Sequence, residues 1–214
     1  MTINISILNA TGRLDNHIDC IEREIEQTLT KVKKYFKLEN IDITVSPFQK
    51  GDEPPSGIGG FAFNSHRVEI LLDCSRDDIN NVIENELLDV LSHEIHHALR
   101  LRFDTPSATL GEQLIMEGLA CHFEHTITNG KPSSLFKDLQ DYDWQESLKK
   151  MTSLLSESDF SVKKFFHGSH PEEFPKYAGY WVGFNLVANY IKDYQVTDTD
   201  MVGLDSDAFF GVLS

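Results

Sequence analysis

The chain has 214 residues, of which 40% are hydrophobic and 25% are charged, a composition that is ordinary for a globular protein and excludes disorder. Its 19 basic and 34 acidic residues give a formal net charge of −15. Such a charge argues against nucleic acid and an anionic membrane surface as partners. The three cysteines lie far apart in the sequence, which excludes a disulfide framework and an all-cysteine zinc site.

The segment 1–17 lacks both the basic region and the apolar region of a signal peptide. No apolar run approaches the roughly 20 residues that a membrane-spanning helix needs. We therefore expect a cytoplasmic protein, and its oligomeric state is open.

The beginning of the chain alternates between strand and helix patterns. Alternating apolar and polar residues predict a short half-buried strand at residues 3–7. Apolar residues at helical spacing then predict an amphipathic helix from about Asp15 to Leu38. A second alternating strand covers residues 41–45, and Pro47 closes it.

A polar loop rich in proline and glycine is expected at residues 50–57. Two strand-like segments follow at 58–65 and 66–73, joined as a hairpin or bend. The run from Gly57 to Ala62 fits the loose dinucleotide-binding pattern G-x-G-x-x-A. We reject that function because a Pro-rich loop precedes the run and a strand pattern follows it, where the motif requires a strand and then a helix.

Helical patterns dominate the remainder of the chain. Asp77 or Asp78 is expected to cap the first helix, and Asn129-Gly130 to end the second. The expected helices and amphipathic segments cover residues 77–99, 109–128, 145–155, 158–167 and 176–194. Strands with one helix, followed by helices alone, predict an α+β fold with segregated halves. We expect a single domain over 1–214, with a strand-rich part at about 1–76 and a helical part at about 77–214.

The first long helix carries the motif H-E-x-x-H as His93, Glu94 and His97. Residues i and i+4 share one face of a helix, so the two imidazoles can converge on one cation. The glutamate projects beside that face, from where it can take a proton from a metal-activated water. The motif therefore predicts a catalytic zinc site with Glu94 as general base.

Catalytic zinc favours three protein ligands and an open position for water. The metzincin pattern would place a glycine at Arg100 and a histidine at Phe103, and both positions fail. The other zincin arrangement takes a glutamate from the next helix, where Glu117 follows His97 by 20 residues. Gly118 beside it is small, as is the nearby Ala120, which would allow the two helices to approach each other.

Several neighbouring residues compete for a role in the site. Glu112 is the alternative carboxylate ligand, although its place at the start of a helix has a simpler electrostatic use. His96 would break the i, i+4 geometry as a ligand, so packing at the cleft rim is the main expectation for it. Asp89 is either a hydrogen-bond partner of a ligand imidazole or a plain acidic surface residue. For His122 and His125, surface or packing roles are expected.

The segments HEIHH, EGLA and YAGYWVGFNLV resemble the YjaZ-like family of predicted zinc-dependent proteases, over roughly residues 60–195. That family belongs to the wider gluzincin group. The resemblance implies a helix with H-E-x-x-H, a second helix with the glutamate ligand, and a small sheet whose edge strand aligns a peptide. The segment GGFAF or the segment RVEILL would be that edge.

The same resemblance implies an oxyanion-stabilising tyrosine, which zinc aminopeptidases carry in a Y-x-x-G motif. Tyr180 to Gly183 is similar to that motif, and a phenol there would stabilise the tetrahedral intermediate. Tyr177 is the rival, and His167 and His170 are further candidates. An aromatic stripe at helical spacing is equally typical of a hydrophobic core.

Together these patterns predict a zinc metallopeptidase that binds Zn²⁺ through His93, His97 and Glu117, with Glu94 and Tyr180 as catalytic residues and a peptide or protein as substrate. No extended glutamate motif of the exopeptidase kind is present, which favours an endopeptidase. The alternatives are a non-hydrolytic regulatory or interaction protein that retains a zinc site, and a helical binding protein without metal.

Overall fold

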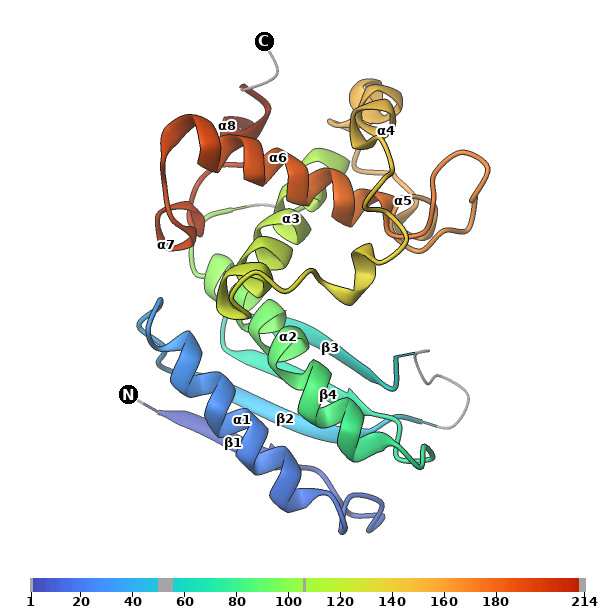
Figure 1. Ribbon diagram of the computed structural model, residues 1–214. Helices are drawn as coiled ribbons and strands as arrows, with labels where there is room; N and C mark the ends of the chain where they lie inside the picture. The colour runs from blue at the N-terminus through green and yellow to red at the C-terminus, as the bar shows by residue number, and fades with distance from the viewer. Residues whose placement is uncertain (1, 50–55, 106, 212–214) are drawn as a thin grey trace. The chain divides into compact units, whose positions relative to one another are not determined.

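The computed structural model describes residues 2–49, 56–105 and 107–211 (Figure 1). The chain divides into two compact units, Met1–Arg102 and Phe103–Ser214, which are described separately below. Most of the polar loop predicted at 50–57 lies outside the described residues. The prediction of one metallopeptidase-like domain over 1–214 stays a prediction.

The first unit is built on a four-stranded sheet with the strand order β1-β2-β4-β3. β1 pairs in parallel with β2, β2 pairs in parallel with β4, and β3 pairs antiparallel with β4. The strands are β1 (Ile3–Ile7), β2 (Ile41–Pro47), β3 (Ile58–Asn64) and β4 (Arg67–Leu72). The predicted hairpin is thus confirmed, and β3 is an edge strand whereas β4 is interior.

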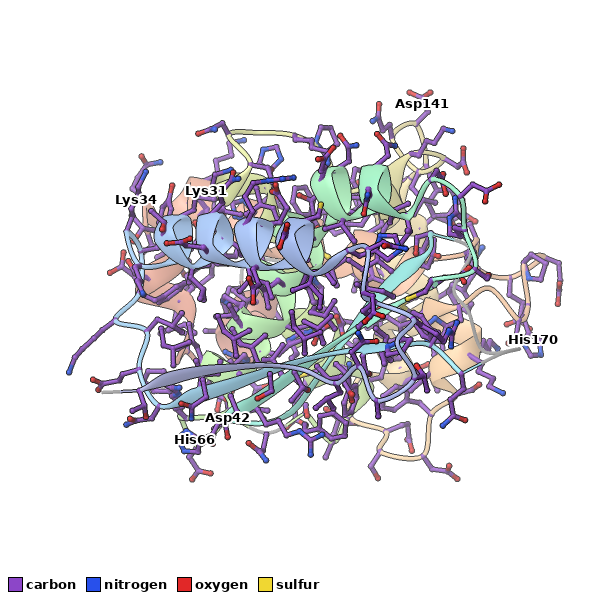
Figure 2. The ribbon with its side chains drawn as sticks, turned by 90° about the horizontal axis from the view of Figure 1, so that it is seen from below. Lys31, Lys34, Asp42, His66, Asp141 and His170 are labelled. Atoms are coloured by element: carbon purple, nitrogen blue, oxygen red, sulfur yellow. The ribbon has the colours of Figure 1, made fainter. Side chains whose placement is uncertain are left out.

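Two helices, α1 (Ile18–Val32) and α2 (Ile79–Arg100), cover one face of this sheet and pack against each other (Figure 1). The sheet contributes alternate apolar side chains to the core beneath them, because successive residues of a strand point to opposite faces. These buried residues are Ile41, Ile43, Val45, Val68, Ile70 and Leu72. Figure 2 shows α1 on one side of the sheet, with Lys31 and Lys34 near its end, and Asp42 on the other side.

Both ends of α1 differ from the prediction, whereas the start of α2 agrees with it. α1 spans Ile18–Val32, whereas the sequence predicted a helix from Asp15 to Leu38; Phe36 and Leu38 beyond its end are nevertheless buried. Asp78 is the N-cap of α2, as predicted, but its side chain makes no capping hydrogen bond. Its carboxylate instead pairs with the Arg76 guanidinium at 2.8 Å, which lowers the pKa of Asp78.

The second unit is helical. Its longest helices, α3 (Leu110–Ile127) and α6 (Ala178–Tyr194), pack against each other, and the shorter helices surround them. The shorter helices are α4 (Trp144–Met151), α5 (Val162–Phe166), α7 (Asp198–Met201) and α8 (Asp207–Phe210), with 3-10 turns η1 (Ser134–Phe136) and η2 (Thr152–Leu154). The sequence did not predict α7 and α8. The α+β fold class is confirmed.

Within the part of the chain that the structure describes, none of the helices combines the length and apolarity needed to cross a membrane.

Candidate metal centre

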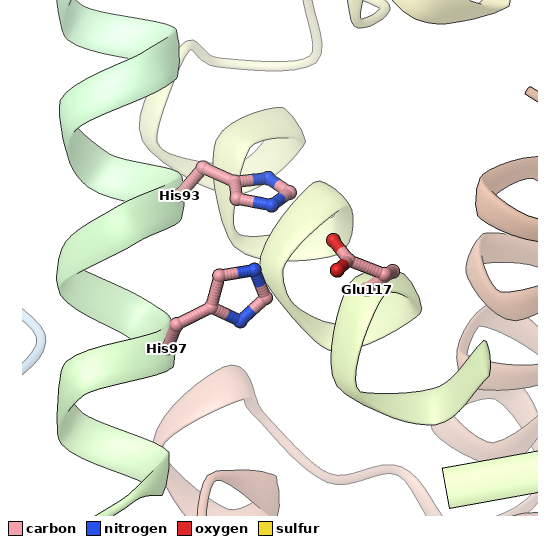
Figure 3. A group of neighbouring side chains, drawn as sticks. All are labelled: His93, His97 and Glu117. Carbon is pink, nitrogen blue, oxygen red and sulfur yellow. The ribbon is translucent and has the colours of Figure 1, made fainter. Parts of the chain in front are cut away.

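His93 and His97 project from the same side of α2, one turn apart (Figure 3). Each offers a ring nitrogen, and these two nitrogens lie within 4.8 Å of each other. The rings meet edge to face with their centroids 4.5 Å apart. Both residues are buried, with exposed fractions of 7% and 6%. A buried pair of imidazoles at this spacing has the donor chemistry and convergence that a zinc ion requires.

Glu94 follows His93 on α2 and lies against the edge strand β3. The space in front of its side chain exists because residue 60 is glycine: a Cβ there would lie 2.5 Å from Glu94 Cγ and 3.0 Å from Glu94 Oε1. The same Cβ would lie 2.9 Å from Val90 Cγ1. The carboxylate of the H-E-x-x-H motif is therefore held between α2 and the backbone of an edge strand.

The third histidine of the motif, His96, is fully buried, and its ring lies edge-on to Phe36 at a centroid distance of 6.0 Å. His96 therefore has the packing role that was expected for it, in a fully buried position. Asp89, one turn before His93, is also buried, with an exposed fraction of 7%.

The start of α3 is fixed by a capping box. Thr109 Oγ1 accepts from the Glu112 N–H, and the Glu112 carboxylate accepts from the N–H groups of Thr109 and Ala108, both at 2.8 Å. The capping box supplies acceptors for N–H groups that would otherwise lack partners at a helix start. Glu112, the alternative ligand, thus has the electrostatic role at the helix start that the sequence suggested.

Glu117 projects from α3 (Figure 3). It is buried, with an exposed fraction of 7%. Its Oε1 accepts a hydrogen bond of 2.8 Å from Gln113 Nε2, one turn earlier on the same helix. A buried carboxylate is costly unless it is hydrogen-bonded or paired with a cation. The Gln113 amide meets part of this requirement, and a carboxylate oxygen is also a donor that zinc accepts.

Gly118 packs against α6, a contact that the sequence did not predict. A Cβ at Gly118 would overlap the backbone of Gly183, and a Cβ at Gly183 would overlap the backbone of Leu114. The two glycines therefore allow α3 and α6 to cross at close range. The expectation that this small residue also serves the approach of the H-E-x-x-H helix stays a prediction.

The tyrosine candidates lie at the start of α6. Tyr180 is half-buried and meets Phe166 edge to face at a centroid distance of 5.2 Å. Tyr177, three residues earlier, is the N-cap of α6, with a positive φ of 69°. His167 ends α5, and His170 Nδ1 lies 2.8 Å from Ser169 Oγ. The Tyr180 side chain thus packs against the core on one side and is partly exposed. Tyr177 differs from it in having a left-handed backbone conformation at the start of the helix.

A polar cluster that the sequence did not predict joins α3 to α7. His122 Nδ1 lies 3.1 Å from Asp198 Oδ1, and Thr126 Oγ1 donates to Asp198 Oδ2 at 2.9 Å. The His122 ring also stacks on Phe184, while His125 meets Phe184 edge to face. Both histidines therefore have the packing roles expected for them. Asp198 was missed because it lies 76 residues from its partner and no local pattern signals the pairing.

A helix that carries H-E-x-x-H with both imidazoles buried is typical of zinc-dependent peptidases. The chain belongs to the family described as predicted Zn-dependent protease (DUF2268), which matches residues 21–210. It is also similar to the uncharacterized protein YjfC of Bacillus subtilis (strain 168), with 25% identity over 130 residues. That match covers 55% of this chain and 44% of YjfC, so it spans less than half of the relative. The expected membership in a family of predicted zinc-dependent proteases is confirmed.

Proposed function

We propose that the protein is a zinc-dependent endopeptidase whose ion is held by His93, His97 and Glu117. The observation that carries the proposal is the buried pair of imidazoles on α2, whose nitrogens lie within 4.8 Å of each other in a chain of this family. Glu117 supports it as a buried carboxylate on the helix that follows α2. Two imidazole nitrogens and one carboxylate oxygen are a donor set that suits catalytic zinc and leaves a position for water.

Bound zinc would supply Lewis acidity, which lowers the pKa of water and polarises a peptide carbonyl. In the proposed reaction Glu94 takes the proton of the attacking water and then delivers it to the leaving amine. Its place against Gly60 supports this role, because a base must be held within hydrogen-bond reach of the proton it removes. Tyr180 is proposed to donate a hydrogen bond from its phenol O–H to the developing oxyanion.

We propose that the substrate pairs with the edge strand β3. Of the two strands suggested by the sequence, β4 is flanked on both sides by other strands, whereas β3 has an unpaired edge within the sheet. An extended peptide can add to such an edge through main-chain hydrogen bonds. β3 also contains Gly60, which lies against Glu94, so a peptide on this edge would run past the proposed base.

The face of β3 turned away from the helices supports a preference for apolar substrate side chains. Phe61 and Phe63 are 55% and 46% exposed and meet edge to face at a centroid distance of 4.8 Å. The Arg67 guanidinium lies over the Phe63 ring at 4.3 Å. Alternate side chains of a paired peptide would lie beside these rings, because successive residues of a strand point to opposite faces.

The variant Glu94→Gln tests the mechanism. It removes the proton acceptor and keeps the size of the side chain, so hydrolysis of a peptide library should fall at least about 100-fold. Zinc content, measured by atomic absorption, should stay near that of the parent. Glu86→Gln on the same helix is the matched control and should cleave like the parent. A Glu94→Gln variant that cleaves as fast as the parent would show that the proposed mechanism is wrong.

The same measurements decide between the proposal and its rivals. A parent protein that binds zinc but cleaves no peptide in a diverse library is a non-hydrolytic zinc protein. A parent protein that takes up far less than one zinc per chain on titration is a binding protein without metal. Both outcomes contradict a peptidase.

A further inference from the structure

Gln113 is the residue whose amide binds the carboxylate of Glu117. Gln113 Nε2 donates to Glu117 Oε1 at 2.8 Å, and the two residues are four positions apart on α3. The amide must present its nitrogen, since an amide oxygen facing a carboxylate oxygen would repel it. The hydrogen bond therefore fixes both the orientation of the amide and the rotation of the carboxylate.

The position of Gln113 on the helix is itself restrained. It follows Glu112, whose carboxylate closes the capping box at the start of α3, so the backbone of this turn is held in place. One residue beyond Glu117, Gly118 packs against the backbone of Gly183. The segment that carries both Gln113 and Glu117 is thus fixed at either end by contacts within the second unit.

We infer that Gln113 is a positioning residue for the proposed zinc site, which holds the Glu117 carboxylate in the orientation that binds the ion. This inference rests on the proposed function. A carboxylate that accepts a hydrogen bond at Oε1 can still bind a cation through Oε2. Hydrogen bonds to the ligands of a metal orient them, and removal of such a bond typically lowers metal affinity or activity about 10- to 100-fold.

The variant Gln113→Met tests the inference, because methionine has nearly the same length and flexibility but no N–H donor. We expect its zinc dissociation constant, measured by competition with a chromophoric chelator, to rise about 10- to 100-fold. At saturating zinc the KM for a peptide should stay unchanged. The visible spectrum of the cobalt-substituted protein should change in the variant, which a purely structural role would not cause. Gln145→Met, an exposed glutamine on α4, is the matched control and should bind zinc like the parent.

Gln113→Ala serves as a second variant, since a smaller side chain cannot clash if methionine does not fit. An unaltered zinc affinity in a folded Gln113 variant, alongside a Glu117→Ala variant that has lost affinity, overturns the inference and leaves the proposed function intact. A parent protein that takes up no zinc overturns the proposed function. A loss of affinity in Gln113→Met and Gln113→Ala, with the Gln145 control unchanged, supports the inference.

Discussion

Gly60 of β3 lies directly against the side chain of Glu94 of α2, so close that a Cβ at residue 60 would stand 2.5 Å from Glu94 Cγ. The backbone of β3, with which the substrate is proposed to pair, therefore lies next to Glu94, the proposed general base. The absence of a side chain at residue 60 is what allows the carboxylate to lie there.

Gly60→Ala is therefore expected to displace Glu94. The substitution should lower kcat for peptide hydrolysis at least about 10-fold, because a small misplacement of a catalytic group is costly in rate. Zinc content should not change, since neither imidazole is touched. Gly211→Ala is the control, because a Cβ there meets nothing within 4 Å. Unchanged steady-state kinetics in Gly60→Ala would contradict the role assigned to this contact.

Alanine variants of the three histidines in this segment should differ in how much zinc they bind. His93→Ala and His97→Ala each remove a proposed ligand, so zinc should fall well below one ion per chain after dialysis. His96→Ala should retain zinc but lower the free energy of unfolding by about 2–4 kcal/mol, because a fully buried ring is deleted from the core. Zinc analysis and urea denaturation of the three variants check both statements. If only the folded His96→Ala protein lost zinc, while the His93→Ala and His97→Ala proteins kept it, His96 would be the ligand and the proposed assignment would be wrong.

What the sequence could predict here depended on local periodicity. The pair His93 and His97 follows from four-residue spacing on one helix, and the hairpin of β3 and β4 follows from alternation around a turn. The contact between Gly60 and Glu94 joins a strand to a helix, and Gly118 meets Gly183 across 65 positions of sequence. Such contacts depend on how elements pack, so the pattern around Gly118 suggested a small residue but not its partner.

The two carboxylates of α3 should also have separable effects. Glu117→Ala removes the proposed ligand, so zinc affinity should fall by at least about 100-fold while the capping box stays intact. Glu112→Ala should keep zinc affinity and lower the free energy of unfolding by about 0.5–2 kcal/mol, since its carboxylate accepts from Thr109 and Ala108. Zinc titration and urea denaturation of both variants make the comparison. The opposite result would make Glu112 the ligand.

The close crossing of α3 and α6 predicts a stability effect at Gly118. A methyl group at this position would overlap the Gly183 backbone, which cannot move aside as a flexible side chain could. Gly118→Ala should lower the free energy of unfolding by about 3 kcal/mol or more, at the upper end of what overpacking costs. The measurement is a urea denaturation curve, with Gly211→Ala as the control. An alanine variant as stable as the parent would show that the helices can separate at no cost.

The exposed pair on β3, Phe61 and Phe63, should determine which peptides are cleaved. Phe61 pairs with Glu69 in the sheet, whereas the neighbouring Val68 and Ile70 of β4 are buried beneath the helices, so Phe61 faces away from them. Aromatic rings on this face favour apolar or aromatic substrate side chains at alternate positions.

The double variant Phe61→Ala/Phe63→Ala should therefore lose that preference, with a fall in kcat/KM of about 10-fold for peptides that carry apolar residues there. Cleavage-site profiling of a peptide library by mass spectrometry measures it. Phe103→Ala, which removes another phenylalanine with 50% exposure, is the matched control and should leave the profile unchanged. If the double variant has the same cleavage profile as the parent, Phe61 and Phe63 do not determine the specificity. Side chains on the helix-facing side of β3 would then be the ones that determine it.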